Sequence, residues 1–110
     1  MNFNDYQKQA LTTAIHHPDP IMDKTIWVLG IAGEAGEIVE KWKKIVAYYD
    51  GVISPENLVE LKKELGDVMW YLALMAESLG LSLEEIAELN LEKLASRKER
   101  NVQRGSGDNR

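Results

Sequence analysis

The sequence predicts an all-α protein built as an antiparallel bundle of four main helices. Apolar residues recur at helical spacing along most of the chain, and no segment shows the alternation of a strand bounded by turn residues. Capping residues, prolines and glycines divide the chain into four helical segments. Their connections are short, which favours antiparallel neighbours, and one domain is expected over residues 1–100.

The first two helices are predicted on either side of a proline-containing junction. Asn4 with Gln7 resembles a capping box at the start of the first helix. The segment Pro18-Asp19-Pro20 ends that helix, because proline disfavours the helical conformation in the residue before it. Asp50-Gly51 is a turn signal after the second helix. These signals predict helices over about 4–16 and 22–49.

The second half of the chain predicts two further helices and a tail. Ser54-Pro55 is an N-cap followed by proline at the first helical position, and Gly80 is a stop signal. Ser82 and Glu85 form a capping box that opens the last helix. These signals predict helices over about 55–79 and 83–100, followed by a disordered polar tail over 101–110. Removal of residues 102–110 is expected to leave activity almost unchanged.

Composition excludes several classes of protein. The absence of cysteine excludes disulfide scaffolds, cysteine–zinc sites and thiol nucleophiles. No apolar run approaches the roughly 20 residues of a membrane span, and the first residues do not resemble a secretory signal. A cytoplasmic protein without a membrane partner is therefore expected.

Charge is divided unevenly along the chain. Residues 1–92 hold 7 Lys/Arg against 16 Asp/Glu, whereas residues 93–110 hold 6 against 2. An acidic body is a poor surface for a nucleic-acid polymer, so none is expected as a partner. The basic end suits either a helix C-terminus or a phosphate-facing role.

The third predicted helix contains nine consecutive apolar residues, from Val68 to Ala76. On a helix such a run is apolar on every face, which is more than one layer of short helices can cover. Part of this helix is therefore expected to pack against another subunit, and Trp70 is assigned to that contact. The bundle is thus predicted to be completed by oligomerisation, in at least a dimer.

Two long helices each place a pair of carboxylates on an apolar stripe. Glu34 lies within the stripe of the second helix with Glu37 one turn later, and Glu64 and Asp67 repeat the arrangement on the third. Residues three apart share a helix face, about 5–6 Å from each other. Desolvated carboxylates that converge repel one another, and a hard divalent cation is the expected partner because it offsets this repulsion. Mg²⁺ fits best, with Mn²⁺ as a substitute.

Four glycines accompany these acids, at positions 30, 33, 36 and 66. Each costs about 1 kcal/mol in a helix interior relative to alanine. The expected compensation is a close approach of the two helices where the carboxylates meet. For the glycines alone, close helix packing without any ligand is the favoured explanation.

Three sequence motifs, in this order along the chain, resemble those of a known family. They are Gly33-Glu34-Ala35-Gly36-Glu37, Glu64-Leu65-Gly66-Asp67, and Asn90-Leu91-Glu92-Lys93-Leu94. The first two look like the E-x-x-E…E-x-x-D signature of the MazG-type all-α nucleoside triphosphate pyrophosphohydrolases. The resemblance covers about residues 5–98 and is to the short single-domain members.

The resemblance implies hydrolysis of a (deoxy)nucleoside triphosphate between the α and β phosphates, giving a monophosphate and pyrophosphate, as in house-cleaning of the nucleotide pool. It implies a homodimer or homotetramer with active sites near subunit contacts. It also implies Mg²⁺ held by Glu34, Glu37, Glu64 and Asp67. A carboxylate not committed to metal can take the proton of the attacking water. Glu34 and Glu37 are both candidates, and the sequence does not choose between them.

Further residues are expected at the substrate, although their patterns also fit other roles. Trp27 and Tyr71 lie on the acid-bearing stripes and can contact a base, but the pattern favours a core aromatic for both, and more strongly for Trp27. Asn90 interrupts the apolar stripe of the last helix, where a buried amide needs partners. The residues expected to contact substrate are Trp27, Lys41, Tyr71, Asn90, Lys93 and Arg97.

Two alternatives to this function stay open. The first is a phosphoribosyl-ATP pyrophosphatase, which a substrate panel would separate from the leading hypothesis. The second is a non-catalytic helical oligomeric adaptor, in which the acids are interhelical polar contacts. An adaptor predicts neither a Mg²⁺ requirement nor pyrophosphate release.

Overall fold

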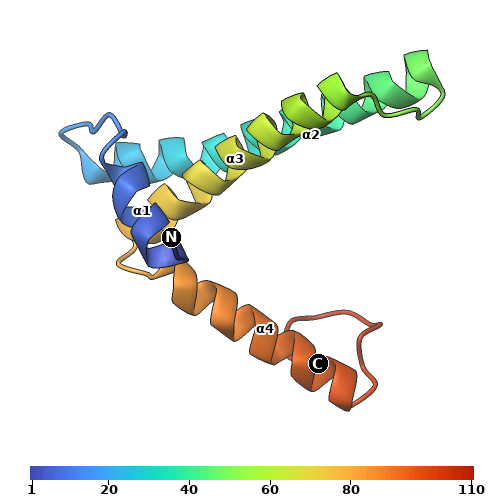
Figure 1. The fold of residues 1–110 in the computed structure, drawn as a ribbon. Coiled ribbons are helices and arrows are strands. Elements are labelled where there is room, and N and C mark those ends of the chain that lie inside the picture. Colours follow the sequence, from blue (N-terminus) through green and yellow to red (C-terminus); the bar gives the residue numbers. More distant parts are fainter.

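Four α-helices and no strands make up the computed structural model, which describes residues 1–110. The helices are α1 (Phe3–Leu11), α2 (Pro20–Tyr49), α3 (Pro55–Ser78) and α4 (Leu83–Glu99). The all-α prediction is confirmed. Helices α2 and α3 form a long antiparallel hairpin, and α1 packs on α3 at the open end of this hairpin (Figure 1).

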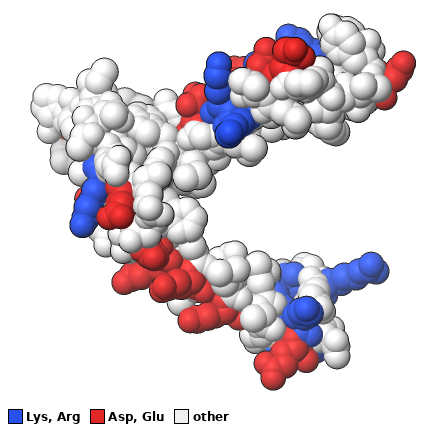
Figure 2. All heavy atoms as spheres, viewed as in Figure 1, with Lys and Arg blue, Asp and Glu red and all other residues white.

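Helix α4 does not lie alongside the hairpin within one chain. It contacts α1 and α3 but not α2, and it projects away from the end of α3 as a separate arm (Figure 1). Figure 2 shows the open space that this leaves between the hairpin and α4. One chain therefore supplies the four predicted helices but does not close them into a bundle.

Local signals set most helix ends as the sequence predicts. Ser54 accepts a hydrogen bond from the Asn57 N–H at 3.1 Å and donates its own N–H to the Asn57 side chain at 2.9 Å. Gly80, just after α3, has a φ of 69°, which glycine adopts without strain. The Ser82 hydroxyl accepts from the Glu85 N–H, which caps α4.

Helix α1 differs from its prediction at both ends. Its N-cap is Asn2 and not Asn4, because the Asn2 side chain accepts a backbone N–H at 2.8 Å. It ends at Leu11 instead of about residue 16. The hydroxyls of Thr12 and Thr13 donate to carbonyls of the last turn, at 2.6 and 2.7 Å, and such local bonds compete with continued helix.

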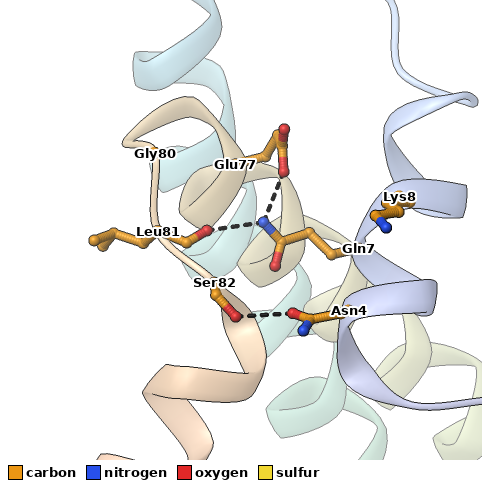
Figure 3. Close-up of a pocket in the computed structure, with 7 residues that line it drawn as sticks. All are labelled: Asn4, Gln7, Lys8, Glu77, Gly80, Leu81 and Ser82. Carbon is orange, nitrogen blue, oxygen red and sulfur yellow. Dashed lines mark hydrogen bonds between the residues drawn. The ribbon is translucent and has the colours of Figure 1, made fainter.

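Gln7 fixes the point at which α4 leaves the rest of the fold. Its side chain is buried, and its amide donates to Glu77 Oε2 at 2.7 Å and to the Leu81 carbonyl at 2.9 Å (Figure 3). Its carbonyl accepts the Leu83 N–H, at the first residue of α4, at 2.7 Å. One side chain of α1 thereby ties together the end of α3, the turn and the start of α4.

The core is small and, apart from Ile45 near the α2–α3 turn, lies at the open end of the hairpin. Only 9 of 110 residues are buried, so the chain covers little of its own apolar surface. Trp27 meets Trp70 edge-on, with ring centroids 5.7 Å apart, and the Trp70 ring N–H donates to the Thr13 hydroxyl at 2.8 Å. Trp70 therefore makes contacts within the chain and stays half-exposed, so its assignment to a subunit contact remains a prediction.

Large apolar side chains stay exposed on both arms. They include Leu65, Met69 and Leu72 on α3, and Leu89, Leu91 and Leu94 on α4. Contiguous exposed patches of this kind usually mark a contact surface. None of the helices combines the length and the apolar content needed to span a membrane.

Asp23 fastens the loop between α1 and α2. Its Oδ1 accepts the His17 backbone N–H at 2.9 Å and lies 2.8 Å from His17 Nδ1, while Oδ2 lies 3.1 Å from His16 Nδ1. The hydrogen bond from the His17 ring, aided by the His17 backbone and by His16, holds the pKa of Asp23 below its usual value against the opposing effect of burial.

The Asp23→Asn variant should be less stable than the wild type, and the difference should depend on pH. A carboxylate with a lowered pKa stabilises the fold above its unfolded pKa and loses that contribution as the pH falls through its folded value. The difference in free energy of unfolding should therefore be fully present above the ordinary aspartate pKa of 3.8 and shrink as the pH falls below it. Urea unfolding followed by circular dichroism across this range checks it; a pH-independent difference would contradict it.

Candidate metal centre

Three of the four predicted carboxylates meet between α2 and α3. Glu34, Glu64 and Asp67 each offer an oxygen, and these oxygens lie within 4.8 Å of one another. Glu34 and Glu64 are half-buried and Asp67 is exposed. No other group of three histidine or acidic side chains in the chain comes this close together. We call these three residues the acidic group.

The acidic group is electrostatically strained in the absence of a cation. Burial, followed by the negative charges of Asp67, Glu64 and Glu37, raises the pKa of Glu34. A positive ion placed among the oxygens would offset this repulsion. All the donors are carboxylate oxygens, which hard divalent ions such as Mg²⁺ and Mn²⁺ prefer. The residues present therefore fit the expected cation.

Glu37 lies outside the acidic group. It is exposed, although its charge still contributes to the raised pKa of Glu34. Three residues advance an α-helix by about 300°, so Glu37 sits about 60° around α2 from Glu34. The i, i+3 spacing predicted that the acids of α2 and of α3 are two equivalent pairs. In the structure only Glu64 and Asp67 both place their carboxylates in the acidic group.

Lys41 is the cation nearest to the acidic group. Its Nζ lies 3.5 Å from Glu64 Oε1 and 3.6 Å from Glu60 Oε2. Burial opposes protonation of Lys41, but the charges and hydrogen bonds of Glu60 and Glu64 raise its pKa overall. Glu60 was not among the residues predicted from the sequence, although its position one turn before Glu64 on the same helix was a usable signal.

Tyr6 is a second neighbour that sequence analysis missed. Burial, and then the negative charge of Asp67, raise the pKa of Tyr6. The phenol therefore lies within electrostatic reach of the acidic group. No spacing rule connects Tyr6 to Asp67, because the two residues belong to separate helices that meet only in the folded chain.

Residues 23–102 match the family model for the MazG nucleotide pyrophosphohydrolase domain. This match spans more than half of the chain and includes the whole acidic group. The chain belongs to the MazG family. It is also 47% identical, over 114 aligned positions, to the Gene 37 protein of Mycobacterium phage L5, and the alignment covers all of both chains. No solved structure shows a significant match.

In this MazG domain Trp27 is a core residue. Its side chain is almost entirely buried, between Trp70 and Tyr71, whose ring centroid is 6.2 Å away. A ring so enclosed offers no face to a base, so the structure favours the core interpretation of Trp27 over stacking. Tyr71 is half-buried and lies one helical turn after Asp67.

Only one of the four glycines is needed for a close approach. The Tyr71 ring lies so close to Gly30 that a Cβ there would overlap the ring carbons. At Gly33, Gly36 and Gly66 a Cβ would meet nothing within 4 Å. The expected contact is therefore between an aromatic ring and the α2 backbone, and not between two backbones at the acids.

Gly30→Ala and Gly33→Ala should change stability in opposite directions. Alanine gains about 1 kcal/mol over glycine in a helix interior, and at the open Gly33 position this gain should be realised. At Gly30 the added methyl group displaces the Tyr71 ring, and overpacking of this kind destabilises by about 1–3 kcal/mol. Thermal unfolding of both variants checks this; equal shifts of the same sign would contradict it.

The three predicted substrate residues of α4 do not reach the acidic group within one chain. Asn90 is exposed on an arm that has no contact with α2. Lys93 and Arg97 instead contact Asp108, because residues 101–110 fold back over α4. One MazG chain thus carries its acids and its α4 cations on separate arms.

Proposed function

We propose that this MazG domain is a Mg²⁺-dependent nucleoside triphosphate pyrophosphohydrolase that cleaves (d)NTP to (d)NMP and pyrophosphate in the cytoplasmic nucleotide pool. The observation that carries the proposal is the acidic group on a hairpin that matches this family. Mn²⁺ is the expected substitute for Mg²⁺.

Glu34, Glu64 and Asp67 would hold the cation. When bound, a divalent ion neutralises phosphate charge and orients the substrate for in-line substitution. Glu37 stands one helical turn from Glu34, exposed and outside the acidic group. Its carboxylate is therefore free to accept a proton from the attacking water, which favours Glu37 over Glu34 as the general base.

The proposed reaction adds one water across the anhydride between the α and β phosphates. The water oxygen forms a bond to phosphorus while the bond from that phosphorus to the bridging oxygen breaks. The Glu37 carboxylate takes the water proton, and pyrophosphate leaves. Lys41, which already pairs with Glu64, is placed to attract substrate phosphate oxygens at the same edge of the group.

We further propose that the chain forms a homodimer or homotetramer. Asn90 and Lys93 lie on an arm that does not contact α2, and both arms expose large apolar side chains. A second copy whose α4 lies against the hairpin would cover these surfaces and bring the α4 polar residues towards the acidic group. The site of one chain is incomplete without this contribution.

Phosphorus NMR of reaction products tests the proposed function. The purified chain is incubated with Mg²⁺ and each ribo- and deoxynucleoside triphosphate, with phosphoribosyl-ATP included to separate that alternative. Nucleoside monophosphate and pyrophosphate are expected as the only products. Formation of diphosphate and inorganic phosphate, or no turnover across the panel, would contradict the proposal.

A further inference from the structure

The loop formed by residues 101–110 covers the basic end of α4. The Asp108 carboxylate lies 3.0 Å from Lys93 Nζ and 3.4 Å from Arg97 Nη2. Arg97 Nη2 also donates to the Asp108 carbonyl at 2.7 Å. Figure 2 shows the basic side chains gathered at this end of the arm, whereas the start of α4 is acidic. One carboxylate therefore pairs with two cations of α4 at once.

The loop is held closed by its own contacts. The Arg110 guanidinium donates to three loop carbonyls, those of Val102, Gln103 and Gly107, at 3.1, 3.0 and 2.6 Å. Gly105 and Gly107 have φ values of 138° and 86°, which only glycine adopts without strain. These contacts give the loop a defined shape that presents Asp108 to α4.

The loop of residues 101–110 provides hydrogen-bond acceptors for only part of the Arg97 guanidinium. Arg97 is 6% exposed, and its Nε is a buried donor without a hydrogen-bond partner. Burial of an unpaired donor is unfavourable, and the guanidinium fork is built to pair with several oxygens at once. The Asp108 side chain is 81% exposed and shares a single oxygen between two cations. Its ion pair with Lys93, whose side chain is 37% exposed, is open to solvent on both sides, and such a pair is weak and easily replaced.

We propose that Lys93 and Arg97 form an anion site for the phosphate chain of a nucleotide, and that Asp108 occupies this site as an internal competitor. In the free protein the loop covers the site. A polyphosphate, which carries more oxygens than a carboxylate, displaces Asp108 and pairs with the guanidinium. The identification of the anion as a nucleotide rests on the proposed function, whereas the competition itself does not.

This proposal changes the expectation for the tail. The sequence alone predicted that removing residues 102–110 would leave activity almost unchanged. A competing carboxylate instead lowers the apparent affinity in proportion to the fraction of molecules in which the loop is closed. Removing the charge of Asp108 should therefore tighten polyphosphate binding.

Titration of the full chain with inorganic tripolyphosphate, without metal and followed by NMR, tests the proposal. The Asp108→Asn variant should bind about three- to tenfold more tightly than the wild type, since the competitor is a weak exposed pair. Asn109→Ala is the matched control, because its side chain makes no hydrogen bond in the structure, and it should bind like the wild type. In the wild type, tripolyphosphate should shift the amide signals of Gly105 and Gly107 as the loop opens.

A second variant separates competition from a general change in charge. Adding Arg97→Gln to Asp108→Asn should remove the gain in affinity, and a nucleoside without phosphates should not shift the loop signals. Equal affinity in the wild type and Asp108→Asn, or binding that leaves the loop signals unchanged, would overturn the proposal.

Failure of this proposal can be told from failure of the proposed function. Tripolyphosphate binding without metal requires neither the acidic group nor turnover. An affinity gain in Asp108→Asn with no pyrophosphate release would contradict the hydrolase alone. Pyrophosphate release with no affinity gain would contradict the competition alone.

Discussion

Glu64→Gln should abolish hydrolysis while leaving the fold intact. Glu64 belongs to the acidic group and also lies 3.5 Å from Lys41, so its loss disturbs both the cation site and its nearest positive side chain. The substitution keeps the size of the side chain and removes one charge. Metal assistance supplies several kcal/mol of transition-state stabilisation, so turnover should fall by about 100-fold or more.

Glu40→Gln is the matched control for this prediction. Glu40 is also a glutamate of the hairpin, but it pairs with Lys43 and Lys44 and lies outside the acidic group. Its variant should keep near-wild-type turnover. Steady-state pyrophosphate release at saturating Mg²⁺ compares the two, and wild-type turnover in Glu64→Gln would rule out the site.

Leu72→Glu should dissociate the predicted oligomer and reduce activity with it. Leu72 is 41% exposed in the single chain, so a glutamate there is tolerated by the monomer fold. In an interface the same charge would be buried and unpaired, which costs several kcal/mol and weakens association by about 100-fold or more. Sedimentation velocity at micromolar concentration measures the change.

Two further variants serve as controls for this assembly prediction. Leu74 is 1% exposed, so Leu74→Glu should unfold the chain itself and not only dissociate it. Lys63→Glu changes charge at an exposed polar position of the same helix and should leave assembly unchanged. A wild-type chain that sediments as a fully active monomer would refute the proposed oligomer.

Local patterns predicted much of the fold and all three residues of the acidic group. Caps at Ser54 and Ser82 and the stop at Gly80 act through bonds between near neighbours in the chain, so the sequence shows them directly. Glu34, Glu64 and Asp67 were identifiable because carboxylates on an apolar stripe need a partner that the stripe does not supply.

The remaining features depend on contacts between helices, which no periodicity encodes. The direction of α4 follows from one buried amide, Gln7, whose partners lie more than 65 positions further along the chain. Trp70 contacts Trp27 and Thr13, which lie in other parts of the chain. The contacts of residues 101–110 with α4 depend on Arg110 and Asp108, isolated charges in a segment whose composition is typical of disorder.

Binding of Mn²⁺ followed by electron paramagnetic resonance most directly tests whether the acidic group is a divalent-cation site. The wild-type chain should bind Mn²⁺, and Mg²⁺ should displace it. Asp67→Asn and Glu34→Gln should each weaken binding at least about tenfold, because each removes one charged ligand, while Glu40→Gln should bind like the wild type. Wild-type affinity in the Asp67→Asn and Glu34→Gln variants, or no binding by the wild type, would contradict the assignment of the metal centre.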